Sequence, residues 1–260
     1  DWSSDVCSSD LKYIHRELSA VIEEAYRYFS VITVTGPRQS GKTTLLRNLF
    51  SYLPYYSLEN LDVRSFAEND PVAFLNQHTE GMILDEVHNA PNLLSYIQGM
   101  VDNDADRRFI LSGSSQFAML KKVTQSLAGR TAVFELLPLS YSEIREQITD
   151  TPLDNLLFNG FYPAIYSGRN IPKFLYPAYM KTYLDKDVRD LLQIKDMMQF
   201  HTFIRLCAGR IGSLFKASEL ANEIGVSSHT VTAWLSVLQA SYIVFLLPPY
   251  FENTDRKSVV

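Results

Sequence analysis

The 260-residue sequence has little cysteine and no long apolar run. Cys7 and Cys207 are too few and too far apart for a disulfide framework, so we expect a reducing, cytoplasmic location. The run over 242–247 is stopped by Pro248 and is too short to span a bilayer. No signal peptide is evident, and no membrane association is predicted.

Positive charge is also scarce, with 24 Lys and Arg against 29 Asp and Glu and a net charge of −5. Such a chain has no general attraction to nucleic acid, so any DNA contact would have to be local. The five histidines show no metal-ligand spacing. The remaining composition, 46% hydrophobic and 20% charged, is globular and allows one large domain or two ordinary ones.

The two ends differ from the rest. Residues 1–11, DWSSDVCSSDL, resemble the translation of a sequencing adapter, and residues 255–260, DRKSVV, resemble read-through at the other end. We expect both segments to be non-native, with a disordered native tail as the alternative. The native protein would then continue past Thr254.

The stretch that organises the chain is VITVTGPRQSGKTT, residues 31–44. A β-branched strand leads into Gly-x-x-x-x-Gly-Lys-Thr and then into helical spacing, the order of a phosphate-binding loop. Glycines let backbone N–H groups and the positive end of a helix face a polyphosphate. A glycine turn that fits by chance is the alternative, and the flanking elements disfavour it. The predicted nucleotide-binding residues are Gly36, Pro37, Arg38, Gln39, Ser40, Gly41, Lys42, Thr43 and Thr44.

A second motif supplies the acids. Lys42 would place its charge at the β and γ phosphates of ATP, and the Thr43 hydroxyl would be a Mg²⁺ ligand. The buried strand predicted over 81–84 ends in Asp85 and Glu86, at the edge where open α/β sheets bind ligands. Asp85 would hold the metal through water, and Glu86 would orient and polarise the attacking water. Two solvated acids after a strand are the alternative for this motif taken alone.

Two further candidates adjoin later strands. The strand expected over 108–111 ends in Ser-Gly-Ser-Ser, in which Ser114 is our candidate for a sensor hydroxyl; a serine-rich turn is the alternative. Arg130 precedes the strand expected over 131–136 and could reach the γ-phosphate of its own or a neighbour's nucleotide. A surface ion pair is the alternative for Arg130.

The remaining pattern is largely helical. We expect a helix over 12–30, a strand over 55–58, and helices over 71–76, 91–101 and 172–192. Asp70 is placed to cap the second of these helices, and Ser140 with Glu143 forms a capping-box pattern. Prolines and glycines punctuate 137–170, which reads as a junction.

Residues 199–251 predict three helices and a hairpin, the pattern of a winged helix-turn-helix. Its second and third helices, over 218–224 and 227–240, are joined at Gly225, and a strand is expected to begin over 242–245. The third helix has no Lys or Arg, with His229 and Trp234 its most notable side chains. Phosphate contacts supply most non-specific DNA affinity, so a structural or protein-contact role is favoured over DNA binding.

GPRQSGKTTL, LDEVHNAP, LSGSS, SLAGR and TYLDKDVRDLL occur in this order before the winged-helix pattern. Together they resemble a widespread prokaryotic family of AAA-type ATPases with a C-terminal domain of unknown function, which begins with a winged helix and often ends in a nuclease-like α/β lobe. The resemblance covers about residues 12–254 and implies ATP binding and hydrolysis, with Arg130 an arginine finger or sensor. The terminal lobe is missing from this sequence.

The sequence therefore predicts an α/β fold: a P-loop NTPase core over 12–150 whose mainly parallel sheet lies between helices, a helical linker over 151–198 and a winged helix over 199–254. Its expected activity is Mg²⁺-dependent ATP hydrolysis that switches the geometry between core and C-terminal unit. The partner would be a protein or a nucleic acid, with homo-oligomerisation as an option. A DNA-binding regulator in which ATP is only a ligand, and a small-molecule kinase, remain alternatives.

Overall fold

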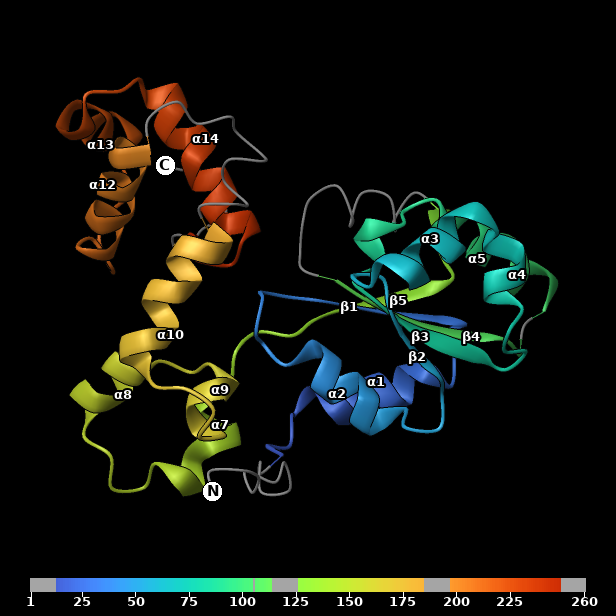
Figure 1. Cartoon of the computed structure of the whole chain (residues 1–260). Helices are drawn as coiled ribbons and strands as arrows, with labels where there is room; N and C mark the ends of the chain where they lie inside the picture. Colours follow the sequence, from blue (N-terminus) through green and yellow to red (C-terminus); the bar gives the residue numbers. More distant parts are fainter. Residues whose placement is uncertain (1–12, 105, 114–125, 185–196, 249–260) are drawn as a thin grey trace, which may run out of the picture. The chain divides into compact units, whose positions relative to one another are not determined.

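The computed structural model describes residues 13–104, 106–113, 126–184 and 197–248 (Figure 1). The chain divides into two compact units, one ending at Leu175 and the other beginning at Tyr176. The presumed adapter segments, most of TYLDKDVRDLL and the candidate Ser114 lie outside the described residues.

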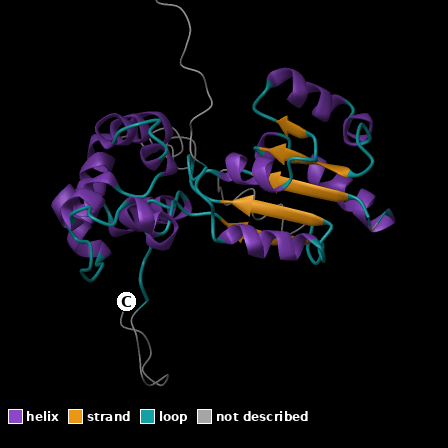
Figure 2. Cartoon of the chain, turned by 90° about the horizontal axis from the view of Figure 1, so that it is seen from below, coloured by secondary structure: helices purple, strands orange, loops and turns teal. Residues whose placement is uncertain are grey.

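The first unit is built on a five-stranded sheet with the order β2-β3-β4-β1-β5. Every pairing is parallel, as predicted, and Figure 2 shows the strand arrows running in one direction. Parallel neighbours need crossover connections, so helices must cover both faces. The strands are β1 (Val31–Thr35), β2 (Tyr55–Ser57), β3 (Gly81–Asp85), β4 (Arg108–Ser112) and β5 (Thr131–Glu135).

Alternate residues of the central strands enter opposite cores. In β1, Val31 belongs to the cluster that includes residues of α3, α4 and α5, whereas Ile32 and Val34 belong to the cluster that includes residues of α1 and α2. Figure 1 shows these two sets of helices on opposite faces of the sheet. The helices are α1 (Leu18–Tyr26), α2 (Lys42–Leu49), α3 (Leu61–Asn69), α4 (Pro71–Leu75) and α5 (Leu93–Asn103), with a 3₁₀ turn η1 (Val87–Asn89) after β3.

Side-chain hydrogen bonds mark where some of these helices begin. The Asp70 carboxylate accepts the Ala73 N–H across 3.0 Å and caps α4, as predicted. The predicted helix over 12–30 is shorter than expected, because α1 begins only at Leu18. The Glu17 N–H donates to the distant Glu143 carboxylate at 2.9 Å, and Ile14 packs with a separate cluster near the end of this unit.

After β5 the first unit continues through α7 (Tyr141–Ile144), the 3₁₀ turn η2 (Arg145–Gln147), α8 (Leu153–Asn159) and α9 (Pro163–Tyr166). The predicted capping box is confirmed: the Ser140 hydroxyl accepts the Glu143 N–H, and the Glu143 carboxylate accepts the Ser140 N–H. This segment has its own small core, made of Leu139, Ile144, Ile148 and Leu156.

The second unit is helical where it is described. α10 (Pro172–Tyr179) begins in the first unit and is followed by a π-helical turn, η3 (Met180–Leu184). α12 (Met197–Ala208), α13 (Ala217–Ile224) and α14 (Ser228–Ala240) share one core. Trp234 lies in it against Phe200 and Phe203, with ring centroids 5.5 and 5.6 Å apart. Trp234 is therefore a packing residue of this core.

The strand predicted to begin over 242–245 is not formed, since residues 242–248 have no strand structure. Tyr242 has a positive φ of 57°, and the N–H groups of Tyr242 and Ile243 donate to carbonyls at the end of α14. The chain thus folds back on that helix, and Ile243 packs against the helical core. The second and third predicted helices are formed on either side of Gly225, and the winged helix-turn-helix as a whole stays a prediction.

Within the described part of the chain, no helix combines the length and apolarity needed to cross a bilayer.

Candidate nucleotide-binding site

The loop from Gly36 to Gly41 joins the carboxyl end of β1 to α2. Gly36 has a φ of +142°, and a Cβ added there would lie 2.2 Å from the Leu136 carbonyl oxygen, so the position needs glycine. Gly41 has a φ of +94° and stands at the N-cap of α2 without a capping side chain. The two glycines thus let the backbone curl at both ends of the loop.

The amino end of α2 opens onto this loop. Its first hydrogen bond runs from the Leu45 N–H to the Gly41 carbonyl at 2.9 Å, so the N–H groups of Lys42, Thr43 and Thr44 precede the intrahelical ladder. Those N–H groups and the positive end of the helix dipole favour an anion.

Lys42 is 6% exposed, and its Nζ donates to the carbonyls of Gly36 at 3.0 Å and Pro37 at 2.9 Å. Burial lowers the pKa of Lys42, while the nearby carboxylates of Glu86 and Asp85 act in the opposite direction. The ammonium group is therefore held inside the loop, where phosphate oxygens could replace the two carbonyls.

Asp85 ends β3 and is fixed by four donors. Its Oδ2 accepts the Thr43 hydroxyl at 2.7 Å and the Tyr55 hydroxyl at 2.8 Å. Its Oδ1 accepts the Ser112 hydroxyl and the Glu86 N–H, the latter at 3.1 Å. The structure thus brings together the two predicted metal ligands, Thr43 and Asp85.

The donor chemistry of this pair fits Mg²⁺. A hydroxyl and a carboxylate are hard oxygen ligands, and Mg²⁺ is commonly held by one or two carboxylates together with substrate phosphates. The described residues contain no group of three or more His, Cys, Asp or Glu side chains suited to a metal.

Glu86 follows Asp85 with a left-handed φ of 54° and begins η1. Its Oε2 lies 3.0 Å from Nδ1 of His88, an ion pair when the imidazole is protonated. The negative charge of Glu86 favours the charged form of Lys42 and so counters the effect of burial on the Lys42 pKa.

The remaining predicted binding residues differ in exposure. Gly36, Pro37 and Ser40 are buried, Arg38, Gly41 and Thr43 are half-buried, and Gln39 and Thr44 are exposed. Gln39 has a positive φ of 62°, and the Thr44 carbonyl accepts the side-chain amide of Asn48 at 2.8 Å.

Arg130 is not brought to the phosphate loop of its own chain, which corrects one expectation. It precedes β5, and Val31 lies opposite Thr131 in the parallel pairing, so Arg130 lies at the amino edge of the sheet. The phosphate loop leaves β1 at the carboxyl edge, about 17 Å away for a five-residue strand. Arg130 instead pairs with Asp102 through contacts of 2.5 and 2.9 Å.

Three side chains near the site were not predicted. Tyr55 and Ser112 donate to Asp85, and Arg16 donates to the Ser40 carbonyl at 2.8 Å. Ser112 belongs to the expected serine-rich turn, and its hydroxyl reaches the carboxylate because β4 lies beside β3. Tyr55 and Arg16 belong to no recognised sequence motif, and only the folded structure brings them to the site.

A phosphate loop after β1, with a hydroxyl on α2 and a carboxylate at the end of β3, defines a P-loop NTPase domain. Residues 28–145 match the family described as AAA domain, and residues 150–260 match a domain of unknown function, DUF8612. The chain thus combines an AAA domain with this second domain.

The chain resembles several uncharacterized proteins. It is 29% identical over 251 residues to one from Mycobacterium tuberculosis, covering 93% of this chain and 55% of that protein. It is 23% identical over 258 residues to one from Methanocaldococcus jannaschii, covering 86% and 58% respectively. The chain therefore spans about half the length of these relatives.

Among solved structures, the Walker-type ATPase of Pyrococcus abyssi has a TM-score of 0.59 and 14% identity, covering 91% of this chain and 93% of that one. At this identity the similarity concerns the fold.

Proposed function

We propose that the chain binds ATP with Mg²⁺ at residues 36–44 and hydrolyses it. One observation carries the proposal: Thr43 and Asp85, which lie 42 positions apart in the sequence, meet at 2.7 Å beside the buried Lys42. A hydroxyl on the first turn of a phosphate-loop helix and a strand-end carboxylate are the pair from which such sites hold a metal.

Each residue would have a distinct task. The loop N–H groups and Lys42 bind phosphate oxygens, and Thr43 with Asp85 holds the metal. Mg²⁺, when bound, neutralises charge that develops on the phosphates. Tyr55 and Ser112 orient the Asp85 carboxylate, and Glu86 accepts a proton from the attacking water.

Phosphate release and nucleotide binding, measured separately on the whole chain, test this proposal. Lys42→Ala should abolish both, because the phosphates lose their main cationic partner. Glu86→Gln should retain binding and lose turnover by at least about a hundredfold, the lower end of the range for a general base. Lys216→Ala and Glu24→Gln are matched controls, since both residues are exposed and Lys216 lies on the second unit.

The same assay separates hydrolysis from phosphate transfer. An ATPase releases phosphate in water without an added acceptor, whereas a small-molecule kinase depends on one. Unchanged phosphate release in Glu86→Gln would contradict the role given to that carboxylate.

The exposed side of α14 supports a protein partner rather than duplex DNA. Its solvent-facing residues are uncharged or His: Ser228, His229, Thr232, Ser236 and Gln239. Two cations of this unit are paired with acids, Arg210 with Glu223 and Lys216 with Glu219 at 2.8 Å. DNA-binding domains instead present unpaired Lys and Arg to the phosphates. Fluorescence anisotropy should therefore show DNA affinity no tighter than non-specific binding, about 10⁻⁴–10⁻⁶ M at physiological salt.

Hydrolysis in this chain would act as a switch on the DUF8612 region. The motivating observation is a proximity within the first unit: a Cβ added to Gly41 would lie 3.7 Å from Cγ of Pro163, the first residue of α9. Pro163 belongs to the region matched by DUF8612, so a loop that tightens on phosphate would push on that region. Hydrogen exchange over 160–170 with and without ATP checks this, and identical exchange in both states would contradict it.

A further inference from the structure

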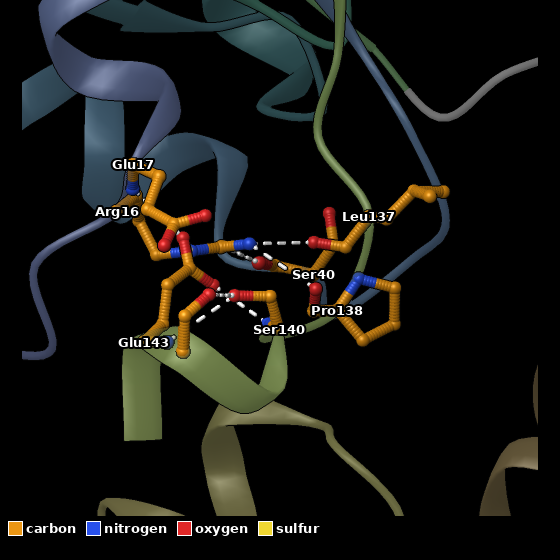
Figure 3. Close-up of polar contacts among 8 residues, drawn as sticks. Arg16, Glu17, Ser40, Leu137, Pro138, Ser140 and Glu143 are labelled. Carbon is orange, nitrogen blue, oxygen red and sulfur yellow. Dashed lines mark hydrogen bonds and ion pairs between the residues drawn. The ribbon is translucent and has the colours of Figure 1, made fainter. Parts of the chain in front are cut away.

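Arg16 precedes α1 and lies outside the residues matched by the AAA domain, yet it is only 6% exposed. Figure 3 shows its guanidinium reaching across to the phosphate loop and to the segment that follows β5. It donates to Glu143 Oε1 at 2.9 Å and to the carbonyls of Ser40 at 2.8 Å, Leu137 at 2.7 Å and Pro138 at 3.3 Å. The Arg16 side chain thus joins the phosphate loop, the segment after β5 and α7.

The Ser40 contact bears directly on phosphate binding. A trans peptide unit is planar, with its carbonyl and N–H pointing in opposite directions. The Ser40 carbonyl and the Gly41 N–H belong to one such unit. When Arg16 fixes the carbonyl, it also fixes the Gly41 N–H to point away from Arg16, and this N–H precedes the amino end of α2.

The Glu143 contact joins this arrangement to α7. The Glu143 side chain is 5% exposed, and it also accepts the Glu17 N–H at 2.9 Å and the Ser140 N–H at 2.8 Å. A buried ion pair depends on both partners, because either charge left alone is poorly solvated. Movement of the loop at Ser40 and movement of α7 are therefore linked through Arg16.

We propose that Arg16 is a positioning residue for the phosphate loop, aiming the Gly41 N–H at the phosphates and tying that orientation to α7 through Glu143. The inference rests on the proposed ATP site. Arginine suits the task because its planar guanidinium carries five donors in a fixed fork, whereas a lysine ammonium is a single point charge.

Arg16→Lys tests the inference while keeping a positive charge beside Glu143. Ser140→Ala is the matched control, because it removes the hydroxyl that caps α7 without touching the Arg16 contacts. Arg16→Lys should raise hydrogen exchange of loop amides over 38–44 in nucleotide-free protein. It should also raise the Kd for ATP about tenfold, the cost of one charged hydrogen bond, with kcat at saturation changed by less than about threefold.

The control should behave differently. Ser140→Ala should raise exchange only over 141–147 and leave the Kd unchanged. Glu143→Gln, which can still form a capping box, should share the Kd effect of Arg16→Lys, and the double variant should be no worse than Arg16→Lys alone.

The inference would be overturned if Arg16→Lys kept the loop exchange and the Kd of the unaltered protein. It would also be overturned if Ser140→Ala raised the Kd as much as Arg16→Lys does, because the effect would then be merely structural. Failure of the unaltered chain to bind ATP would instead overturn the proposed function. The exchange comparison in nucleotide-free protein would then still decide whether Arg16 orders the loop.

Discussion

The Thr43 hydroxyl donates to the Asp85 carboxylate across 2.7 Å, joining the first turn of α2 to the end of β3. Thr43 lies on α2, which follows β1, whereas Asp85 ends β3, and β4 separates β1 from β3 in the sheet. The two residues therefore meet because α2 packs against β4 and β3, and not through pairing of β1 with β3. This contact brings together the two residues that would hold the metal in the proposed site.

Removing the Thr43 hydroxyl should weaken the effect of Mg²⁺ on nucleotide binding. In Thr43→Val the shape is retained, but the metal loses one ligand and Asp85 loses one donor. We expect ATP affinity in Mg²⁺ to fall about tenfold or more, with little change in EDTA. Titrations of a fluorescent ATP analogue check this. Thr43→Ser should bind normally, and equal losses with and without Mg²⁺ would contradict metal ligation.

Gly36→Ala should be strongly destabilising, because the new Cβ would lie 2.2 Å from the Leu136 carbonyl oxygen and the φ is +142°. Overpacking and backbone strain together should reduce the free energy of unfolding by about 3 kcal/mol or more. Urea unfolding measures the change.

Gly99→Ala is the control for Gly36→Ala. Gly99 lies inside α5, and nothing lies within 4 Å of its added Cβ. We expect this variant to be more stable by about 0.5–1 kcal/mol, from helix propensity alone. A Gly36→Ala protein as stable as wild type would show that the loop can move away from β5.

The sheet and the phosphate loop could be predicted from the sequence, because their signals are local. The β-branched run over 31–35, the spacing from Gly36 to Lys42 and the acids at the end of β3 each depend on neighbouring residues. The capping box of Ser140 and Glu143 is equally local, and it was also confirmed.

The contacts around the loop could not be predicted, since they join distant residues. Arg16 and Glu143 are 127 positions apart, and Tyr55 reaches Asp85 only through the register of β2 on β3. The wing was expected from the strand-like residues over 242–245, of which Ile243 and Val244 here pack against the helical core.

Arg130→Ala should leave ATP turnover in the single chain unchanged within about twofold, because Arg130 lies at the opposite edge of the sheet and forms an exposed ion pair. The hydrogen bond from Arg130 lowers the pKa of Asp102, so the variant should return that pKa toward its ordinary range. Phosphate release at two protein concentrations checks the prediction. A loss that grows with protein concentration would instead support a role toward a neighbouring molecule.

Tyr55 should make stability sensitive to alkali. Burial, and then its hydrogen bond to Asp85, raise the pKa of Tyr55 above the ordinary value of 10.0. A raised folded-state pKa stabilises the folded protein fully below pH 10.0, and this contribution is lost as pH rises through the folded-state value. Tyr55→Phe cannot ionise and has no such contribution.

We therefore predict that the free energy of unfolding falls more steeply between about pH 9 and pH 11.5 in the unaltered protein than in Tyr55→Phe. Urea unfolding at several pH values measures both slopes. The other tyrosines with a raised pKa, Tyr13, Tyr26 and Tyr166, are present in both proteins and affect both slopes alike. Tyr28→Phe, at a residue 77% exposed, should keep the wild-type slope. Equal slopes for Tyr55→Phe and the unaltered protein would contradict a raised pKa of Tyr55 in the folded protein.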